Sequence, residues 1–182
     1  MLEPQTANGK VLWHFTMSLD GFVAGPGHSM DWMAGTTSRP GLVTEYATTT
    51  GAILGGRDGW DAYPDPNGIY GGDWQGPLFV LTSHPEDATP TEGVTFLNCG
   101  PAEAVRIALE AAGGKNLEVF SPNIGRQLLQ LGLIDEIDLH IAPVLLGDGI
   151  RLYDNPGGTP IRLHGLGKVD PFAEVDVRFK PI

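Results

Sequence analysis

The stretch Asn116-Leu-Glu-Val-Phe-Ser-Pro-Asn-Ile-Gly-Arg-Gln-Leu-Leu129 decides the fold, because it joins a buried strand, a sharp turn and the start of a helix. The strand is short and apolar, and Pro122 suits the first position of a helix. Ile124, Leu128 and Leu131 then follow at helical spacing. The stretch therefore predicts one strand-to-helix unit of an α/β protein.

The turn inside this unit is a candidate anion site. The first residues of a helix present unpaired N–H groups and the positive end of the aligned peptide dipoles, and both favour a phosphate. An ordinary connection between a strand and a helix has the same pattern. The stretch alone leaves the two interpretations open.

Composition limits what surrounds this turn. The chain has 182 residues, of which 41% are hydrophobic, so we expect one globular domain over 1–182 with a flexible N-terminus at 1–9. The 11 basic residues face 22 acidic ones, and this net charge of -11 argues against nucleic acid or an anionic membrane as a partner. No apolar run approaches the roughly 18 residues of a membrane span. We therefore expect a cytoplasmic protein with a small-molecule partner.

Strands and helices alternate along the chain before a strand-rich end. Helices are predicted over 40–50, over 101–112 and from residue 122, and a surface loop over 63–76. Strands are predicted over 11–17, 52–54, 78–81, 94–97, 116–120, 137–146 (interrupted at Pro143), 161–164 and 175–179. This order favours parallel strands with crossover helices, closed by antiparallel strands at the C-terminal end.

Three turns come directly after buried strands, at 55–58, 81–83 and 121–125. In an open α/β sheet, ligands bind outside the carboxyl ends of the parallel strands, so turns of this kind can meet at one ligand. Arg57 suits a phosphate because its planar guanidinium donates in a fixed geometry. Its alternative role is a surface charge that pairs with Asp58 or caps a helix.

Thr82 and Ser83 supply small hydroxyl groups beside the proposed ligand. Such side chains allow a flat ring or a phosphate to approach closely. The alternative is a local turn before Pro85, in which a hydroxyl bonds its own backbone.

Three longer motifs carry a resemblance: Ser18-Leu-Asp-Gly21, Leu54-Gly-Gly-Arg57 and the segment from Gly132 to Tyr153. With them the chain resembles the dihydrofolate-reductase-like superfamily. Within it, the chain is similar to the C-terminal reductase domain of the bifunctional riboflavin-biosynthesis deaminase/reductase. The resemblance implies a three-layer α/β fold with a central, mixed, mostly parallel sheet, flanked by helices and ending in antiparallel strands. It also implies an NADPH-dependent oxidoreductase that is often a homodimer.

The resemblance also implies a reaction: hydride transfer to a small heterocycle. The substrate is either an aminopyrimidine, as in 5-amino-6-(5-phosphoribosylamino)uracil reduction, or a pterin-like compound. A phosphoribosyl group would require several cations near the pocket, and the chain has only 11 Lys and Arg in all. The alternative function is that of a non-catalytic dimeric nucleotide-binding protein with a weakened cofactor site.

Site residues follow from the resemblance, position by position. The implied catalytic residue is Asp20, for which a role as a brace of its loop is an equal alternative. The substrate pocket is implied at Asp31, Trp32 and Arg151; the alternatives are that Trp32 packs in the core and that Arg151 lies at the dimer contact or only pairs with Asp154. The implied NADPH-binding residues are Thr16, Ala24 and Gly25 at the nicotinamide, Gly56, Arg57 and Asp58 at the 2′-phosphate and pyrophosphate, Leu81, Thr82 and Ser83 at the adenine ribose, and Ser121, Pro122, Asn123, Ile124, Gly125 and Arg126 at the pyrophosphate.

At one turn the chain departs from the family, which has paired glycines where this chain has Ser121-Pro122. Because an X–Pro bond favours trans by only about 0.5 to 1 kcal/mol, we expect this bond to be cis, as the glycine pair commonly is. Pro122 also removes one N–H donor from the predicted phosphate site. The five His residues lack metal-ligand spacing, and carboxylates do not gather round them in the sequence, so we expect no metal.

Overall fold

The computed structural model describes residues 3–166 and 175–181. Its strands are β1 (Val11–Ser18), β2 (Phe22–Ala24), β3 (Thr50–Gly56), β4 (Leu78–Leu81), β5 (Val94–Leu97), β6 (Asn116–Phe120), β7 (Glu136–Ala142), β8 (Ile150–Arg151), β9 (Leu163–Gly165) and β10 (Val175–Pro181). Its α-helices are α1 (Leu42–Thr49), α2 (Arg57–Ala62), α3 (Pro101–Ala111) and α4 (Pro122–Gln130). Single 3-10 turns lie at Pro26–His28, Asp31–Met33, Ile69–Gly72 and Pro85–Asp87.

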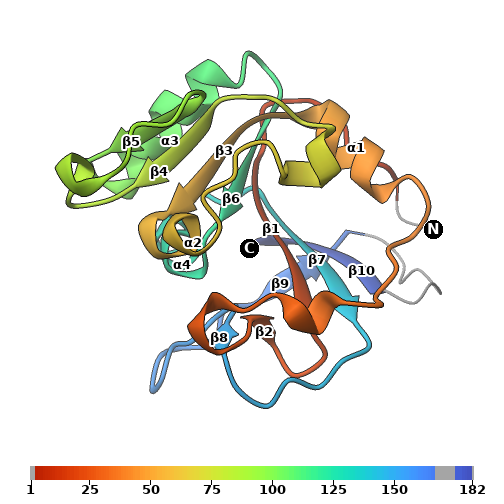
Figure 1. The fold of residues 1–182 in the computed structure, drawn as a ribbon. Helices are drawn as coiled ribbons and strands as arrows, with labels where there is room; N and C mark the ends of the chain where they lie inside the picture. Colours follow the sequence, from red (N-terminus) through yellow and green to blue (C-terminus); the bar gives the residue numbers. More distant parts are fainter. Residues whose placement is uncertain (1–2, 167–174, 182) are drawn as a thin grey trace.

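Eight strands form one sheet in the order β5-β4-β3-β6-β1-β7-β10-β9 (Figure 1). The six strands from β5 to β7 are parallel, and β10 is antiparallel to both β7 and β9. Strands β2 and β8 pair separately as a short antiparallel ribbon. The predicted α/β architecture, with antiparallel strands at its C-terminal end, is therefore confirmed.

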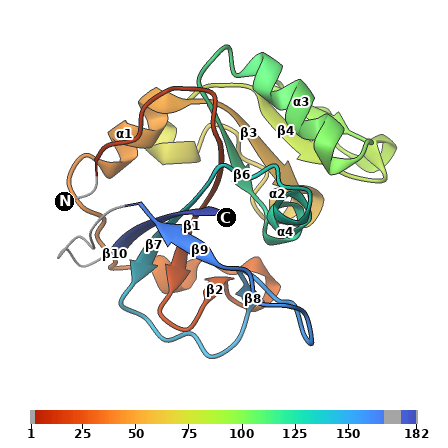
Figure 2. The same ribbon diagram turned by 180° about the vertical axis from the view of Figure 1, so that it is seen from behind.

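Helices cover both faces of the sheet. Helices α3 and α4 pack on one face over the main apolar core, which includes Trp13, Leu54 and Val119 (Figure 2). On the other face, Leu12 packs with Leu42 and Tyr46 of α1. No helix of the described residues is long and apolar enough to cross a membrane.

Two sequence predictions differ from the structure in this region. Strand β7 ends at Ala142 and does not continue through 144–146, because the chain turns at Pro143 and the Val144 N–H donates to the Ala142 carbonyl (2.8 Å). Leu131, predicted on the same helix face as Ile124 and Leu128, lies just past the end of α4 at Gln130 and is 57% exposed.

The N-terminal segment, predicted to be flexible, makes specific contacts. Gln5 is buried, and its amide nitrogen donates to Glu136 (2.6 Å) and to Asp138 (2.7 Å) on β7. Asn116 at the start of β6 accepts from the backbone N–H of Asn8 (3.2 Å). These bonds attach the segment to the edge of the sheet at which β6 and β7 begin.

Candidate active site

A cavity of about 1170 Å³ opens at the carboxyl ends of the parallel strands. Helices α2 and α4 begin side by side there, after β3 and β6 (Figure 1). Ligand sites of proteins commonly have volumes of about 300 to 1,000 Å³, so the space suffices for more than one small ligand. The three turns singled out in the sequence all reach this one cavity.

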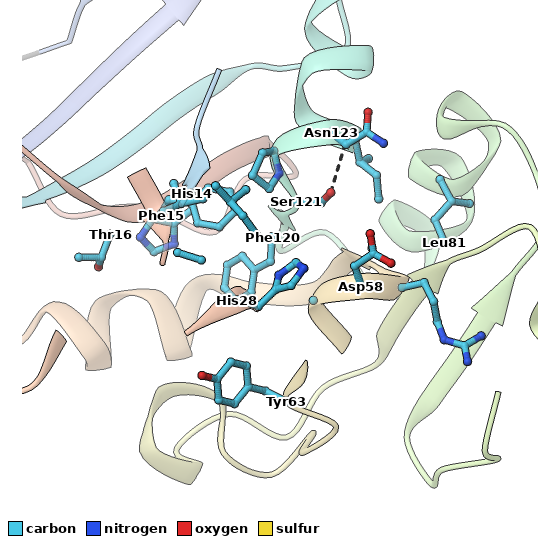
Figure 3. Close-up of a pocket in the computed structure, with 18 of the residues that line it drawn as sticks. His14, Phe15, Thr16, His28, Asp58, Tyr63, Leu81, Phe120, Ser121 and Asn123 are labelled. Atoms are coloured by element: carbon cyan, nitrogen blue, oxygen red, sulfur yellow. Dashed lines mark hydrogen bonds between the residues drawn. The ribbon is translucent and has the colours of Figure 1, made fainter. Parts of the chain in front are cut away.

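Most of the predicted NADPH-binding residues line the cavity. These are Thr16, Ala24, Gly56, Arg57, Asp58, Leu81, Thr82, Ser83, Ser121, Pro122, Asn123 and Ile124. Figure 3 shows Thr16 on one side of the view and Asp58 and Leu81 on the other, with Ser121 and Asn123 between them. Gly25, Gly125 and Arg126 are not among the lining residues.

Ser121 and Pro122 start α4 in a way that the sequence predicted only in part. Ser121 is the N-cap, and its hydroxyl oxygen accepts from the Ile124 N–H (3.2 Å). Pro122 occupies the first helical position, where a missing N–H costs least. The predicted cis bond is wrong: no described peptide bond is cis, because the extended Ser121 backbone leads into the helix through a trans bond.

Gly125 has a packing role in the structure. A Cβ at this position would lie 2.1 Å from the indole atoms of Trp13, which is 1% exposed in the main core. The absence of a side chain therefore allows α4 to lie directly on β1. Arg126 does not line the cavity, but it donates to the side chain of Asn123, which does (3.1 Å).

Arg57 lies at the cavity and also makes local contacts on the surface of the protein. It lines the cavity, and its Nε donates to the Asp61 carboxylate (2.7 and 2.8 Å) rather than to Asp58. Its terminal nitrogens donate to the carbonyls of His84 (3.1 Å) and Asp87 (3.2 Å). Because a guanidinium has five N–H donors, two remain beyond these described contacts.

Thr82 makes the local turn and also lies at the cavity. Its hydroxyl oxygen accepts from the His84 N–H (3.1 Å), which is the local turn expected as the alternative. Thr82 and Ser83 nevertheless line the cavity. The turn thus fixes the Thr82 hydroxyl beside the cavity.

Asp20 does not line the cavity, in contrast to its predicted catalytic role. Its carboxylate accepts from the Ser18 hydroxyl (2.7 Å) and from the backbone N–H groups of Leu146 (2.9 Å) and Gly147 (2.7 Å). These bonds lower the pKa of Asp20 to about 2, with the Leu146 N–H as the largest cause. The observed contacts are those of a brace between two loops.

The three predicted substrate-pocket residues also lie outside the lining. Arg151 places its guanidinium 4.7 Å from the centre of the Phe22 ring. Asp31 and Trp32 lie in a 3-10 turn whose neighbours Met30 and Met33 do face the cavity. Asp31 and Trp32 are thus next to residues of the cavity lining but are not part of it.

A buried histidine pair at the floor of the cavity was missed by sequence reasoning. His14 on β1 and His140 on β7 both line the cavity, and their Nε2 atoms are 2.6 Å apart. The Nδ1 of His14 lies 3.1 Å from the Glu118 carboxylate and 3.1 Å from the Tyr70 hydroxyl. The expectation that no carboxylate gathers round the histidines is therefore wrong for His14.

The network continues below the pair. Glu118, completely buried on β6, also accepts from the hydroxyls of Tyr70 (2.5 Å) and Thr50. On β7, Asp138 accepts from the Tyr46 hydroxyl (2.6 Å), and the Nε of Arg178 lies 3.7 Å from the Asp138 carboxylate. Burial, aided by the charge of a neighbouring glutamate, raises the pKa of Asp138 to about 7.

The strand register explains why these residues meet. Strands β6, β1 and β7 are adjacent at the centre of the sheet, and His14 pairs with Asp138. Polar side chains at alternate positions of β7 therefore share a face with those of β1. The signal was present in the sequence as a glutamate inside an apolar strand and as the pattern Asp138-Leu-His140.

Among the described residues, one exposed group, His84, Glu86 and Asp87, has ligand atoms spaced closely enough for a metal ion. All three side chains are on the surface. Exposed acidic groups of this kind are common without a metal, so we assign none to it.

A six-stranded parallel sheet extended at one edge by the antiparallel pairings of β10, with a cavity at the carboxyl ends of its strands, is the arrangement of a dihydrofolate-reductase-like fold. Dihydrofolate reductase from Enterococcus faecalis, in a structure with NADP(H), superposes with a TM-score of 0.62 at 12% identity over 97% of this chain and 99% of that one. A protein from Shewanella sp. PV-4 assigned to riboflavin biosynthesis superposes with a TM-score of 0.74 at 18% identity over 95% and 99%.

The chain belongs to the RibD C-terminal domain family, whose model matches residues 9–170. The deaminase/5-amino-6-(5-phosphoribosylamino)uracil reductase of Thermotoga maritima superposes with a TM-score of 0.70 at 14% identity. That comparison covers 97% of this chain and 57% of the Thermotoga chain. The uncharacterized protein YwjB of Bacillus subtilis is 26% identical over 160 residues, which are 86% of this chain and 90% of that protein. The family resemblance inferred from the three motifs is confirmed.

Proposed function

We propose that this protein is an NADPH-dependent reductase that transfers a hydride to a small heterocycle. The observation that carries the proposal is the single cavity into which three separate turns, after β3, β4 and β6, bring their predicted cofactor-binding residues. Membership of a family with reductase structures supports the reaction type.

The residues of the cavity fit a nicotinamide dinucleotide. The N-terminus of α4, with the Ser121 and Asn123 side chains, would hold the pyrophosphate, and Arg57 would use its two remaining donors on the 2′-phosphate. Gly56 lies so close to Ser121 that a Cβ would be 3.2 Å from its hydroxyl oxygen, which leaves bare backbone beside the predicted phosphate position. When bound, a reduced nicotinamide supplies a hydride.

The chain's own part is binding and orientation. Thr16 on β1 and Ala24 on β2 would position the nicotinamide in the cavity, whose lining includes the aromatic rings of Phe120 and Tyr70. We propose that Asp20 acts indirectly, by holding the loop at 144–147. Correct placement of the reacting atoms is the main contribution to a hydride transfer.

The substrate we propose lacks a phosphate group. Arg57 is the one Lys or Arg side chain among the described residues that line the cavity, and the proposed 2′-phosphate contact already uses it. A phosphoribosyl group on the substrate would therefore meet no further lysine or arginine of the lining. An unphosphorylated aminopyrimidine or pterin-like ring fits aromatic walls better.

Titration with NADPH and NADH, followed by nicotinamide fluorescence, tests the proposal. We expect NADPH to bind, and Arg57→Ala to weaken NADPH by at least about tenfold while affecting NADH little, because a charge-assisted phosphate contact is lost. Arg106→Ala is the matched control, since Arg106 on α3 also pairs with a carboxylate (2.8 Å) but does not line the cavity. No binding of either nucleotide at near-millimolar concentration contradicts the reductase and favours a non-catalytic protein of the same fold.

A further inference from the structure

His28 differs from the other histidines of the cavity. It ends the 3-10 turn after β2, is partly buried and lines the cavity. Its ring nitrogens make no described hydrogen bond or ion pair, whereas the rings of His14, His84 and His140, which also line the cavity, each make at least one. Among the described histidines of the lining, His28 is therefore the one whose ring is available to a ligand.

The backbone holds His28 in an unusual conformation. Its φ is 64°, and Tyr70 (53°) is the one other described non-glycine residue with a positive φ; both line the cavity. Such conformations cost free energy and cluster at ligand sites. Two hydrogen bonds close the turn, from the Gly25 N–H to the Ser29 carbonyl (2.8 Å) and from the Ser29 N–H to the Pro26 carbonyl (3.3 Å). The position of His28 is thus set by its own turn.

This turn lies next to the start of α2, which in turn lies next to the start of α4. The segment Pro26–His28 packs against α2. Gly56, the residue before α2, lies so close to α4 that a Cβ on it would be 3.2 Å from the Ser121 hydroxyl oxygen. The structure therefore brings His28 to the part of the cavity where we place the pyrophosphate.

The order of the residues along the cavity agrees with this placement. In the view of Figure 3, the His28 imidazole lies between Thr16 on one side and Asp58 on the other. We place the nicotinamide beside Thr16 and the 2′-phosphate at Arg57, the neighbour of Asp58. The pyrophosphate joins the nicotinamide half of the nucleotide to the adenosine half, so it belongs between these two positions.

The start of α4 alone offers few donors to this pyrophosphate. Pro122 has no N–H, the Ile124 N–H donates to the Ser121 hydroxyl oxygen (3.2 Å), and the Gly125 N–H donates to the Ser121 carbonyl (2.9 Å). Of the backbone groups at 122–125, the Asn123 N–H is the one without a described acceptor. The Ser121 hydroxyl can still donate its own proton, but a further donor is needed to surround a pyrophosphate.

The charge of the cavity leads to the same conclusion. Arg57 is the one Lys or Arg among the described lining residues, and the 2′-phosphate occupies it in our proposal. Asp58 adds a carboxylate to the lining, and the whole chain has a net charge of -11. An anion at the middle of the cavity therefore gains most from a side chain that can donate as a cation, and an imidazole can do so.

We propose that His28 binds the pyrophosphate of NADPH, with an imidazole N–H that donates to a phosphate oxygen opposite the start of α4. This inference rests on the proposed reductase function. It adds a cofactor-binding residue from the loop after β2 to the turns that follow β3, β4 and β6. His28 then supplies a donor where Pro122 has removed one.

Three nucleotides separate this contact from the neighbouring ones. NADPH contains every group, 2′-phospho-ADP-ribose lacks the nicotinamide, and adenosine 2′-monophosphate lacks the pyrophosphate. We expect His28→Asn to bind the first two about tenfold more weakly, as for the loss of one hydrogen bond to a charged group, and the third equally well. Asparagine tolerates a positive φ, so the turn is kept while the imidazole is lost. Calorimetric titration of the whole protein gives all three affinities.

His164→Asn is the matched control, because His164 on β9 is exposed and does not line the cavity. It should change none of the affinities. Unchanged binding of 2′-phospho-ADP-ribose by His28→Asn overturns the inference, and a loss for NADPH alone then places His28 at the nicotinamide. An equal loss for adenosine 2′-monophosphate also overturns it. Failure of the wild-type protein to bind any of the three overturns the reductase and this inference together.

A crystal of the wild-type protein soaked with 2′-phospho-ADP-ribose tests the contact without a variant, so misfolding of His28→Asn cannot obscure the result. We expect a ring nitrogen of His28 at about 2.7 to 3.2 Å from a pyrophosphate oxygen. A bound nucleotide whose pyrophosphate makes no contact with His28 overturns the inference and leaves the cofactor site intact.

Discussion

Gly125 offers the sharpest test of how the structure differs from the pattern of the sequence. The family resemblance implies that it lies at the pyrophosphate, whereas the structure places it against the buried indole of Trp13. A Cβ built on Gly125 lies 2.1 Å from Trp13 Cε2 and Nε1, a distance that real Cβ atoms do not adopt. Gly125→Ala must therefore displace either the start of α4 or a ring that fills the main core.

The magnitude follows from two opposing effects. Overpacking a well-filled core costs about 1 to 3 kcal/mol, and the short distance together with the rigid indole places this site at the upper end. Alanine in place of a helical glycine contributes a gain of about 1 kcal/mol. We expect Gly125→Ala to lower the free energy of unfolding by about 2 kcal/mol.

Urea unfolding followed by tryptophan fluorescence measures this change. Gly59→Ala on α2 is the control, because a Cβ there meets nothing within 4 Å, and we expect it to be neutral or more stable by up to about 1 kcal/mol. If Gly125→Ala unfolds at the wild-type urea concentration and loses only NADPH affinity, the packing explanation is refuted and the role at the pyrophosphate is restored.

Three further outcomes follow from the structure. Burial raises the pKa of Asp138 from 3.8 to about 7, so the native state binds this proton more tightly than the unfolded chain does, and the free energy of unfolding falls by a few kcal/mol between about pH 4 and 7. Asp138→Asn should remove this pH dependence in urea unfolding, and an equal slope in both proteins contradicts the prediction. The pKa of Asp20 is lowered to about 2, so the Leu146 and Gly147 amides should stay protected from hydrogen exchange until the pH falls below about 4. Asp20→Asn should speed their exchange at neutral pH without weakening NADPH binding, whereas unchanged exchange together with lost binding contradicts the role of Asp20 as a brace between the loops. Asp61→Ala frees the Nε of Arg57, so NADPH should bind several-fold more tightly with NADH unchanged and stability altered by less than about 1 kcal/mol, whereas weaker NADPH binding shows that Asp61 orients the guanidinium.

The order of strands and helices was predictable because the spacing of apolar residues in each segment matches either a strand or a helix. The run at 52–54 and the helix after Pro101 needed only local pattern and capping residues, and both appear in the structure. The end of β7 was not predictable from hydrophobicity, since the segment after Pro143 is apolar but is held by loop contacts. Predicted positions for the antiparallel strands were correct to within a few residues.

The candidate site divides in the same way. Turns that follow strands can be read from the sequence, and Arg57, Thr82 and Ser121 indeed line one cavity. The histidine pair depends on the neighbours of β1, which the sequence does not give. An amphipathic strand such as β7 has the same pattern whether its polar face meets water or, as at Asp138 and His140, a buried network.

Several properties predicted from the sequence are not tested by the structure. The homodimer and the cytoplasmic location stay predictions, as does the identity of the substrate. The single domain over 1–182 also stays a prediction. In the strand predicted at 175–179, the side chains of residues 175–177 lie outside the described part of the structure.

A crystal structure of the protein soaked with NADPH tests the central claim most directly. The account predicts density for the pyrophosphate at the N–H groups that begin α4, beside Ser121 and Asn123, and for the nicotinamide ring beside Thr16 and above the His14–His140 pair. A nucleotide bound elsewhere, or a cavity that holds no NADPH at saturating concentration, contradicts it.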